Sequence, residues 1–327
     1  MSESDGHLFD MASLSNEKAT KFPVSDAPPI WTRNKAQFIA RYLKAFTYVT
    51  KHGTYIDAFA GPQHEETSEV SWAAKLVMEN EPARIRNFYL FELDAAKVKE
   101  LEGLRDDYVQ RIGDMRGRSV CVTAGDCNQT VPDFLTKNPI KEKEASFCLF
   151  DQRTTECAWD TVRFVANHKG SQGGHKIELF YFLAQGWIDR AIKSWKKEGH
   201  AERCKRWWGN DDALAFLELT SHERGRHMAE RFQKELGYTY AYPFPIQQEG
   251  RDGRIMFWMI HASDHPRAPV LMWQAYRHIG AGGGLNDPLE QLDLDFDEAA
   301  LSGAGDNNPP RPLPYPNAGG VEAFVST

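Results

Sequence analysis

The chain has 327 residues, of which 41% are hydrophobic and 26% charged, and its formal net charge is −7. A chain of this length can bury a full core without disulfides or a structural metal, and its negative charge disfavours general attraction to polyanions. The cysteines form no CxxC pair, residues 1–10 lack the apolar core of a secretion signal, and no run approaches the roughly 18 apolar residues of a membrane span. We therefore expect a cytoplasmic protein with reduced cysteines and no membrane association.

The first elements are an arm and a helix, followed by a series of strands. Residues 1–30 are polar and show no clear period, so we expect an N-terminal arm. From Thr32 to Val49, apolar residues recur at spacings of three and four, the pattern of an amphipathic helix. Apolar runs dense enough for strands buried on both faces follow at 54–59, 87–93, 119–125, 146–151 and 177–183. Amphipathic stretches alternate with these runs, which predicts βαβ units and a parallel sheet.

The end of the series defines the fold class. After a longer helical region (188–236), two last strands at 240–247 and 254–262 flank a hairpin turn. Five βα units followed by a hairpin are the strand plan of the class I methyltransferase fold. We predict an α/β domain over residues 31–280: a doubly wound, mostly parallel seven-stranded sheet with its last strand antiparallel and helices on both faces. Residues 281–327, rich in glycine, proline and acids, are expected to form a tail without its own core.

Carboxylates end four consecutive predicted strands. Asp57, Glu92, Asp126 and Asp151 each follow an apolar run directly. In an open α/β sheet, ligands bind outside the carboxyl ends of the strands, so these acids should meet at one edge. A single acid there is readily explained as a helix N-cap, as for Asp94 or Asp126 taken alone. Four in succession favour a ligand site.

The residue types suit an adenosyl ligand with an amino-acid end, S-adenosylmethionine. Glu92 can accept hydrogen bonds from both ribose hydroxyls, and Asp126 can accept one from an adenine amino group. Asp57 and the Gly61 turn would face the methionine end, where an ammonium needs acceptors and a carboxylate needs backbone N–H groups. Without ligand, we expect the Glu92 carboxylate to be solvated and to contribute little to folding.

Residues 32–279 resemble the three-Cys-motif partner (TcmP) proteins, a bacterial family with a class I methyltransferase-like fold. The similar segments are TRNKAQFIARYLKAF (32–46), YIDAFAGP (55–62), FELD (91–94) and MIHASDHPRAPVLMWQ (259–274). The resemblance implies a functional partner with three cysteines, and a lysine of the first helix that reaches the cofactor carboxylate. The expected cofactor-binding residues are Lys35, Asp57, Phe59, Ala60, Gly61, Pro62, Glu92, Leu93, Asp126, Cys127 and Asp151.

Two positions depart from the family's pattern. Gln63 stands where the family's turn usually has a second glycine, and the segment 151–156, DQRTTE, replaces a motif similar to D-P-F-G that borders the methyl acceptor. We expect Asp151, Arg153 and Glu156 to act on an unidentified acceptor, with Arg153 suited to a carboxylate or phosphate. The alternative is a polar loop with an internal ion pair.

Three functions are compatible with these features. The first is a methyltransferase that uses S-adenosylmethionine, and the second is a non-catalytic accessory protein of the same fold that works with a partner. A distant third is a nuclease-like hydrolase with a metal bound by Asp57, Asp126 and Asp151. We expect no metal site, because His261 and His265 at a strand end would not share a face.

A basic and aromatic stretch at 193–210 raises the question of nucleic acid. Trp195, Trp207 and Trp208 alternate there with lysines and arginines, as in some single-strand binders. Tryptophans that pack inward from an exposed helix are the favoured interpretation, because the chain is negative overall.

Overall fold

The structure, a computed structural model, describes residues 30–31, 34–62, 71–194, 200–247 and 254–285. Gln63, the predicted arm up to residue 29 and the tail from residue 286 lie outside these ranges. The division of the chain into arm, domain and tail therefore stays a prediction.

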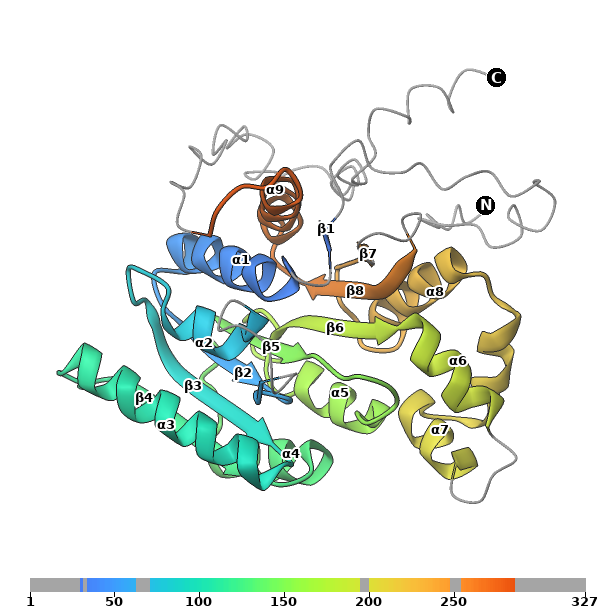
Figure 1. Cartoon of the computed structure of the whole chain (residues 1–327), viewed down its shortest axis with the longest axis horizontal. Helices are drawn as coiled ribbons and strands as arrows, with labels where there is room; N and C mark the ends of the chain where they lie inside the picture. Colours follow the sequence, from blue (N-terminus) through green and yellow to red (C-terminus); the bar gives the residue numbers. More distant parts are fainter. Residues whose placement is uncertain (1–29, 32–33, 63–70, 195–199, 248–253, 286–327) are drawn as a thin grey trace. The chain divides into compact units, whose positions relative to one another are not determined.

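The described residues build one sheet with the strand order β1-β7-β8-β6-β5-β2-β3-β4. Strands β2 to β6 run parallel to one another, whereas β8 lies between β6 and β7 and is antiparallel to both (Figure 1). The strands are β1 (Ile30–Trp31), β2 (Gly53–Asp57), β3 (Ile85–Glu92), β4 (Ser119–Ala124), β5 (Ser146–Phe150), β6 (Glu178–Ala184), β7 (Tyr240–Gln247) and β8 (Ile255–Ser263).

This topology confirms the predicted fold class, a doubly wound α/β sheet of the class I methyltransferase type. One strand was not predicted: β1, two residues long, pairs in parallel with β7 at the sheet edge. Two residues are too few to show an alternating pattern, so only the pairing reveals this strand.

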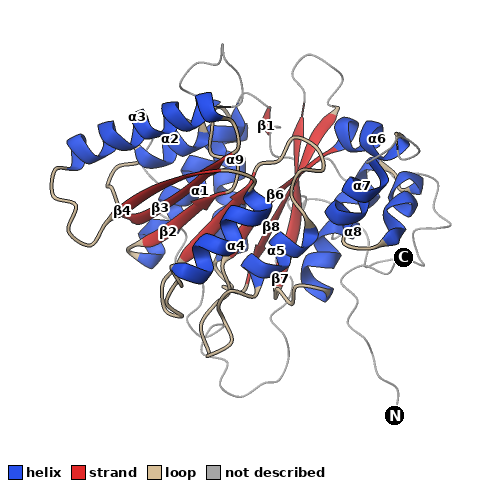
Figure 2. Ribbon diagram, turned by 90° about the horizontal axis from the view of Figure 1, so that it is seen from below, coloured by secondary structure: helices blue, strands red, loops and turns tan. Residues whose placement is uncertain are grey.

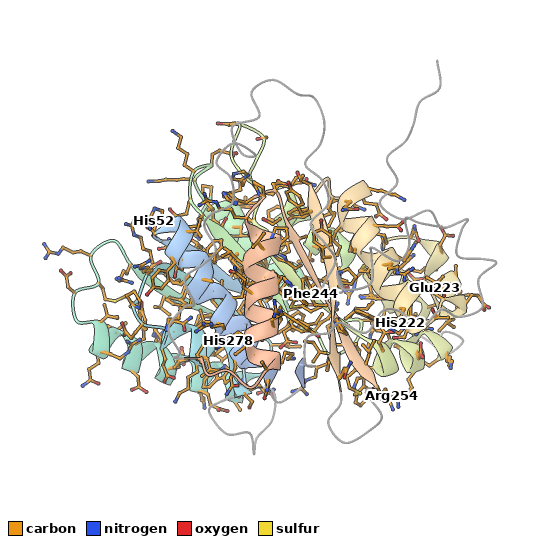
Figure 3. All side chains as sticks on the ribbon, turned by 90° about the horizontal axis from the view of Figure 1, so that it is seen from above. His52, His222, Glu223, Phe244, Arg254 and His278 are labelled. Carbon is orange, nitrogen blue, oxygen red and sulfur yellow. The ribbon has the colours of Figure 1, made fainter. Side chains whose placement is uncertain are left out.

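Helices cover both faces of the sheet (Figure 2). They are α1 (Lys35–Thr50), α2 (Ala73–Met78), α3 (Ala95–Ile112), α4 (Cys127–Lys137), α5 (Trp159–Ala166), α6 (Gln185–Lys193), α7 (His200–Trp208), the 3-10 helix η4 (Asp211–Glu218), α8 (Ser221–Lys234) and α9 (Ala268–Gly280). Seen from above, α1 and α9 lie side by side on one face (Figure 3), where the rings of Phe38 and Tyr276 pack with centroids 5.6 Å apart.

The strand residues are apolar because both of their faces are covered. All residues of β5 and β6 are buried. Successive side chains alternate between the faces. On β2, Tyr55 packs against Phe88 and Phe147, whereas Ile56 belongs to the core that also contains residues of α4 to α8. The edge strand β4 is only half-buried, which explains its more mixed sequence.

A buried polar cluster fixes the pairing of β6 with β8, at the end of β6 remote from its carboxyl edge. The carboxylate of Glu178, the first residue of β6, accepts hydrogen bonds from Tyr42 and from Ser263, the last residue of β8. The Nε2 atom of His261 lies 2.9 Å from Glu178 Oε1. His261 is thus bound within the core, as expected for a structural histidine.

The helical stretch rich in tryptophan packs inward. Trp207 and Trp208 are 1% and 4% exposed, and Trp195 lies outside the described residues. The guanidinium of Arg231 stacks between Trp159 and Trp208, 4.0 and 4.1 Å from their ring centroids. These buried tryptophans are therefore not a stacking surface for nucleic acid. In the described part of the chain, no helix is long and apolar enough to cross a membrane.

Candidate functional site

A cavity of about 210 Å³ opens at the carboxyl edge of the parallel strands. Its walls come from the ends of β2, β3, β4 and β5 and the segments that follow them. The lining residues are Ala58, Phe59, Gly61, Glu92, Leu93, Lys97, Gly125, Asp126, Cys127, Asp151, Arg153 and Glu156. The structure thus brings together most of the residues singled out from the sequence. Lys35, Asp57, Ala60 and Pro62, which were also expected to contact a cofactor, do not line this cavity.

Glu92 holds the end of β3 and the turn after β2 together. Its Oε1 accepts hydrogen bonds from the backbone N–H groups of Leu93 and Asp94, each at 2.9 Å. Its Oε2 accepts the N–H of Gly61 at 3.0 Å. The expectation that this carboxylate is structurally idle without ligand is therefore wrong. Since each carboxylate oxygen offers two acceptor sites, Oε2 keeps one for a ligand hydroxyl, fewer than the two hydroxyl contacts expected.

Gly61 is required for the close approach of this turn to Glu92. A Cβ atom at Gly61 would lie 2.4 Å from Glu92 Oε2 and 2.9 Å from the Cβ of Lys97. No side chain fits at that distance without displacing the carboxylate. The single glycine of the turn thus serves a backbone-to-carboxylate contact.

Asp57 lies beneath the turn and not in the cavity wall. The side chain is 1% exposed, and its oxygens accept hydrogen bonds from the Tyr55 hydroxyl at 2.7 Å and the Phe59 N–H at 3.1 Å. Burial raises the pKa of Asp57 to about 7, with smaller contributions from the charges of Asp151 and Glu92, while the two hydrogen bonds act in the opposite direction. The acid therefore supports the shape of the turn.

Lys35 forms an ion pair with Asp151, the acid that follows β5. Its Nζ lies 2.7 Å from Asp151 Oδ1, and both side chains are less than 10% exposed. The ammonium also lies 4.8 Å and 5.0 Å from the ring centroids of Phe182 and Phe257. Aromatic faces attract a cation, so the site stabilises the charged lysine beside its partner. Lys35 thus acts through Asp151, which does line the cavity.

The loop after β5 is held by hydrogen bonds of the Gln152 amide and the Glu156 carboxylate. Gln152 is fully buried: its Oε1 accepts the N–H of Cys157 at 3.1 Å and its Nε2 donates to the carbonyl of Phe182 on β6 at 3.4 Å. Glu156 Oε2 accepts the N–H of Thr154 at 2.6 Å. These hydrogen bonds fix the conformation of the polar DQRTTE segment, and the Arg153 side chain of this segment is exposed at the cavity.

Asp126 is a helix cap and a wall residue at once. Its Oδ1 accepts the backbone N–H and the Nδ2 of Asn128, at 2.9 and 2.8 Å. Asn128 in turn donates to the carbonyl of Glu156 at 2.8 Å and accepts the N–H of Ala158 at 2.7 Å. These bonds tie the start of α4 to the loop after β5. Asp94, at the start of α3, is an N-cap outside the cavity wall.

Three residues at the cavity or in its support, Lys97, Asn128 and Gln152, were not predicted from the sequence. Lys97 lies in the first turn of α3, three residues after the cap, and so enters the wall by helix geometry. Asn128 is two residues after Asp126, a spacing at which an amide can bond to a capping acid. Gln152 has no local signal, because its partners lie on other segments.

Three cysteines at and behind the cavity wall, of which Cys127 lines the cavity, pack as apolar side chains. Cys127, Cys148 and Cys157 are 5%, 0% and 0% exposed and belong to one hydrophobic core. Burial raises the pKa of Cys148 and Cys157 well above the usual thiol value, with a hydrogen bond to Cys127 adding to the shift at Cys157. Such thiols are inert as nucleophiles.

Within the residues that the structure describes, no group of three or more His, Cys, Asp or Glu side chains is arranged to hold a metal ion. In particular, Asp57, Asp126 and Asp151, the set considered for a hydrolase, do not form such a cluster.

The sheet order and the cavity at its carboxyl edge define a class I methyltransferase-like α/β protein. Among solved structures, the methyltransferase domain of bacterial CtHen1-C is similar, with a TM-score of 0.37 and 9% sequence identity. The match covers 69% of this chain and 97% of that domain's chain. No protein-family model and no curated protein sequence matches this chain.

Proposed function

We propose that this protein is a methyltransferase that binds S-adenosylmethionine in the cavity and transfers its methyl group to an acceptor at the loop after β5. One observation carries the proposal: the Gly61 turn, Glu92, Asp126 and Asp151, each from a different strand end, line a single cavity.

The wall chemistry fits the cofactor. One acceptor site on Glu92 Oε2 suits a ribose hydroxyl, and the neighbouring Leu93, an apolar side chain that is 73% exposed, offers a contact surface for the adenine ring. Asp126 uses Oδ1 for its capping bonds, so Oδ2 can accept from the adenine amino group. Acidic side chains outnumber basic ones four to two in the wall, which suits a ligand that carries a sulfonium and an ammonium.

The bound cofactor supplies an activated methyl group, and the protein's task is to position the acceptor in line with it. Asp151, held by Lys35, and Glu156, held by the Thr154 N–H, are the carboxylates at the acceptor end of the cavity. We assign to them the orientation of the acceptor and the removal of its proton. The exposed guanidinium of Arg153 would bind an anionic group on the acceptor.

Membership of the three-Cys-motif partner family, with a three-cysteine protein as functional partner, belongs to this proposal as well. It rests on the FAGP turn and the other similar segments. The second candidate, an accessory protein without catalysis, is favoured by the Lys35–Asp151 ion pair, which neutralises one of the two carboxylates assigned to the acceptor.

Isothermal titration calorimetry with S-adenosylmethionine and S-adenosylhomocysteine tests cofactor binding. The proposal predicts a dissociation constant below about 1 mM for both ligands. If neither ligand binds at that level, the proposed function fails. A second assay measures S-adenosylhomocysteine formation with cell lysate or nucleic acid as acceptor source. Turnover excludes the accessory protein, whereas binding without turnover favours it.

A further inference from the structure

The outer face of α6 carries one aromatic and two basic side chains in a row. Trp187, Arg190 and Lys193 recur at a spacing of three residues and are all exposed, while Ile188 and Ile192 of the same helix are buried. Residues three apart lie on the same side of a helix. We call Trp187, Arg190 and Lys193 the α6 stripe.

The tryptophan of the stripe has one face covered and keeps much of its surface in water. The Arg190 guanidinium lies 3.9 Å from the centroid of the Trp187 ring, and Trp187 remains 49% exposed. About half of this large aromatic side chain is thus available for contact with a ligand. The arginine stacks on one face of the ring, and the other face is the one that a flat ligand could cover.

Positive charge extends from the stripe to the start of β8. Arg254 Nη2 lies 3.4 Å from the position that a Cβ atom would occupy at Gly186, next to Trp187 (Figure 3 labels Arg254). Arg190, Lys193 and Arg254 form no ion pair with an acid of the described residues. The acid of α6, Asp189, is paired instead with the buried Arg224. The surface is therefore locally basic on a chain that is acidic overall.

The stripe begins at the same sheet edge as the cavity. β6 runs parallel to β5, whose end carries Asp151, and α6 starts directly after β6 (Figure 1). Gln152 of the cavity loop also bonds to the Phe182 carbonyl on β6. A long ligand that lies on the stripe can therefore extend towards the acceptor loop.

We infer that the α6 stripe, together with Arg254, binds single-stranded nucleic acid. A base stacks on the open face of Trp187, and the three cations contact phosphates. Aromatic stacking combined with basic side chains is the general mode of single-strand binding. An acidic peptide would satisfy the charges but offers no flat ring to Trp187. Nucleic-acid binding by the α6 stripe does not depend on the proposed function. The further step, that the bound strand is the methyl acceptor, rests on the proposed function.

Fluorescence anisotropy tests the binding with the full chain, a labelled mixed-sequence RNA of about 12 nucleotides and its DNA equivalent, without cofactor. We expect binding that weakens with salt, with a log–log slope of about −0.7 for each phosphate contacted. Trp187→Ala should weaken binding roughly five- to hundredfold, and Trp187→Phe should restore most of it. Arg190→Glu combined with Lys193→Glu should weaken binding further and lower the salt slope by at least about 1.4.

The control variant is Lys137→Glu, which reverses an exposed charge at the end of α4 and should bind like the wild type. The inference is overturned if no oligonucleotide binds below about 100 µM at 50 mM salt, or if the stripe variants bind like the control. It is also overturned if a polyglutamate peptide binds the stripe more tightly than RNA does. Calorimetry with S-adenosylmethionine on the same variants should match the wild type. If the protein binds RNA through the stripe but does not bind S-adenosylmethionine, the proposed function is refuted and the inference about the stripe stands.

Discussion

Replacing Glu92 with alanine should weaken the fold, because this carboxylate holds a turn, and under the proposed function it should also weaken cofactor binding. In the protein without ligand it accepts three backbone hydrogen bonds, one of them from Gly61, which is 31 residues away in the sequence. Glu92→Ala removes all three bonds and one remaining acceptor site that faces the cavity.

The magnitudes follow from these bonds. Loss of an acidic N-cap, which satisfies one or two backbone N–H groups, costs about 0.5–2 kcal/mol. Glu92 satisfies three and fastens a distant turn, so we expect the free energy of unfolding to fall by about 1–3 kcal/mol. One charge-assisted hydrogen bond to a ribose hydroxyl contributes about 1.5–3 kcal/mol, which corresponds to a ten- to 150-fold increase in the dissociation constant of S-adenosylmethionine.

Asp94→Ala is the matched control, because Asp94 caps α3 with two backbone bonds but does not line the cavity. It should lose about 0.5–2 kcal/mol of stability and less than about threefold in affinity. Urea unfolding gives the first quantity and calorimetry, at a temperature where both variants are folded, gives the second. Equal affinity losses in the two variants, or an unchanged affinity in Glu92→Ala, would refute the assignment of Glu92 to the ligand. An unchanged stability in Glu92→Ala would refute its role in holding the turn.

Three further perturbations test the site and its support. Gly61→Ala should displace the Glu92 carboxylate and weaken cofactor binding, measured by calorimetry, at least about tenfold. If the variant binds with wild-type affinity, the turn can accept a side chain. Asp57 has its pKa raised by burial from 3.8 to about 7, so its contribution to stability is fully present below pH 4 and is lost as the pH rises to 7. Wild-type stability should fall across this window by up to about 4 kcal/mol relative to Asp57→Asn, whereas parallel profiles of melting temperature against pH would contradict the assignment. Glu178→Gln should lower the free energy of unfolding, measured in urea, by about 2–4 kcal/mol, because a buried acceptor oxygen beside His261 is replaced by an N–H donor. The affinity for the cofactor should stay unchanged. A loss below about 1 kcal/mol would show that the Glu178 cluster does not hold β8 in place.

The sequence by itself determined where the seven longer strands lie along the chain and at which edge of the sheet the candidate site lies. β5 and β6 are apolar throughout because both faces are buried, so their positions could be predicted to within a residue or two. Parallel strands present their carboxyl ends together, so acids after successive strands predicted a shared wall. These inferences use only local patterns and one topological rule, and three of the four predicted acids, Glu92, Asp126 and Asp151, do line the cavity.

Only the tertiary structure decided what each acid does. Lys35 and Asp151 are 116 residues apart and meet because α1 packs near the end of β5, a contact that no spacing in the sequence encodes. Asp57 and Glu92 are equivalent in the sequence, each the last residue of a strand, yet the turn covers Asp57 and leaves part of Glu92 at the cavity. The role of a side chain depends on which of its hydrogen-bonding atoms have no partner after the chain has folded. Folding brings together segments that are far apart in the sequence, and local sequence periodicity does not report these contacts.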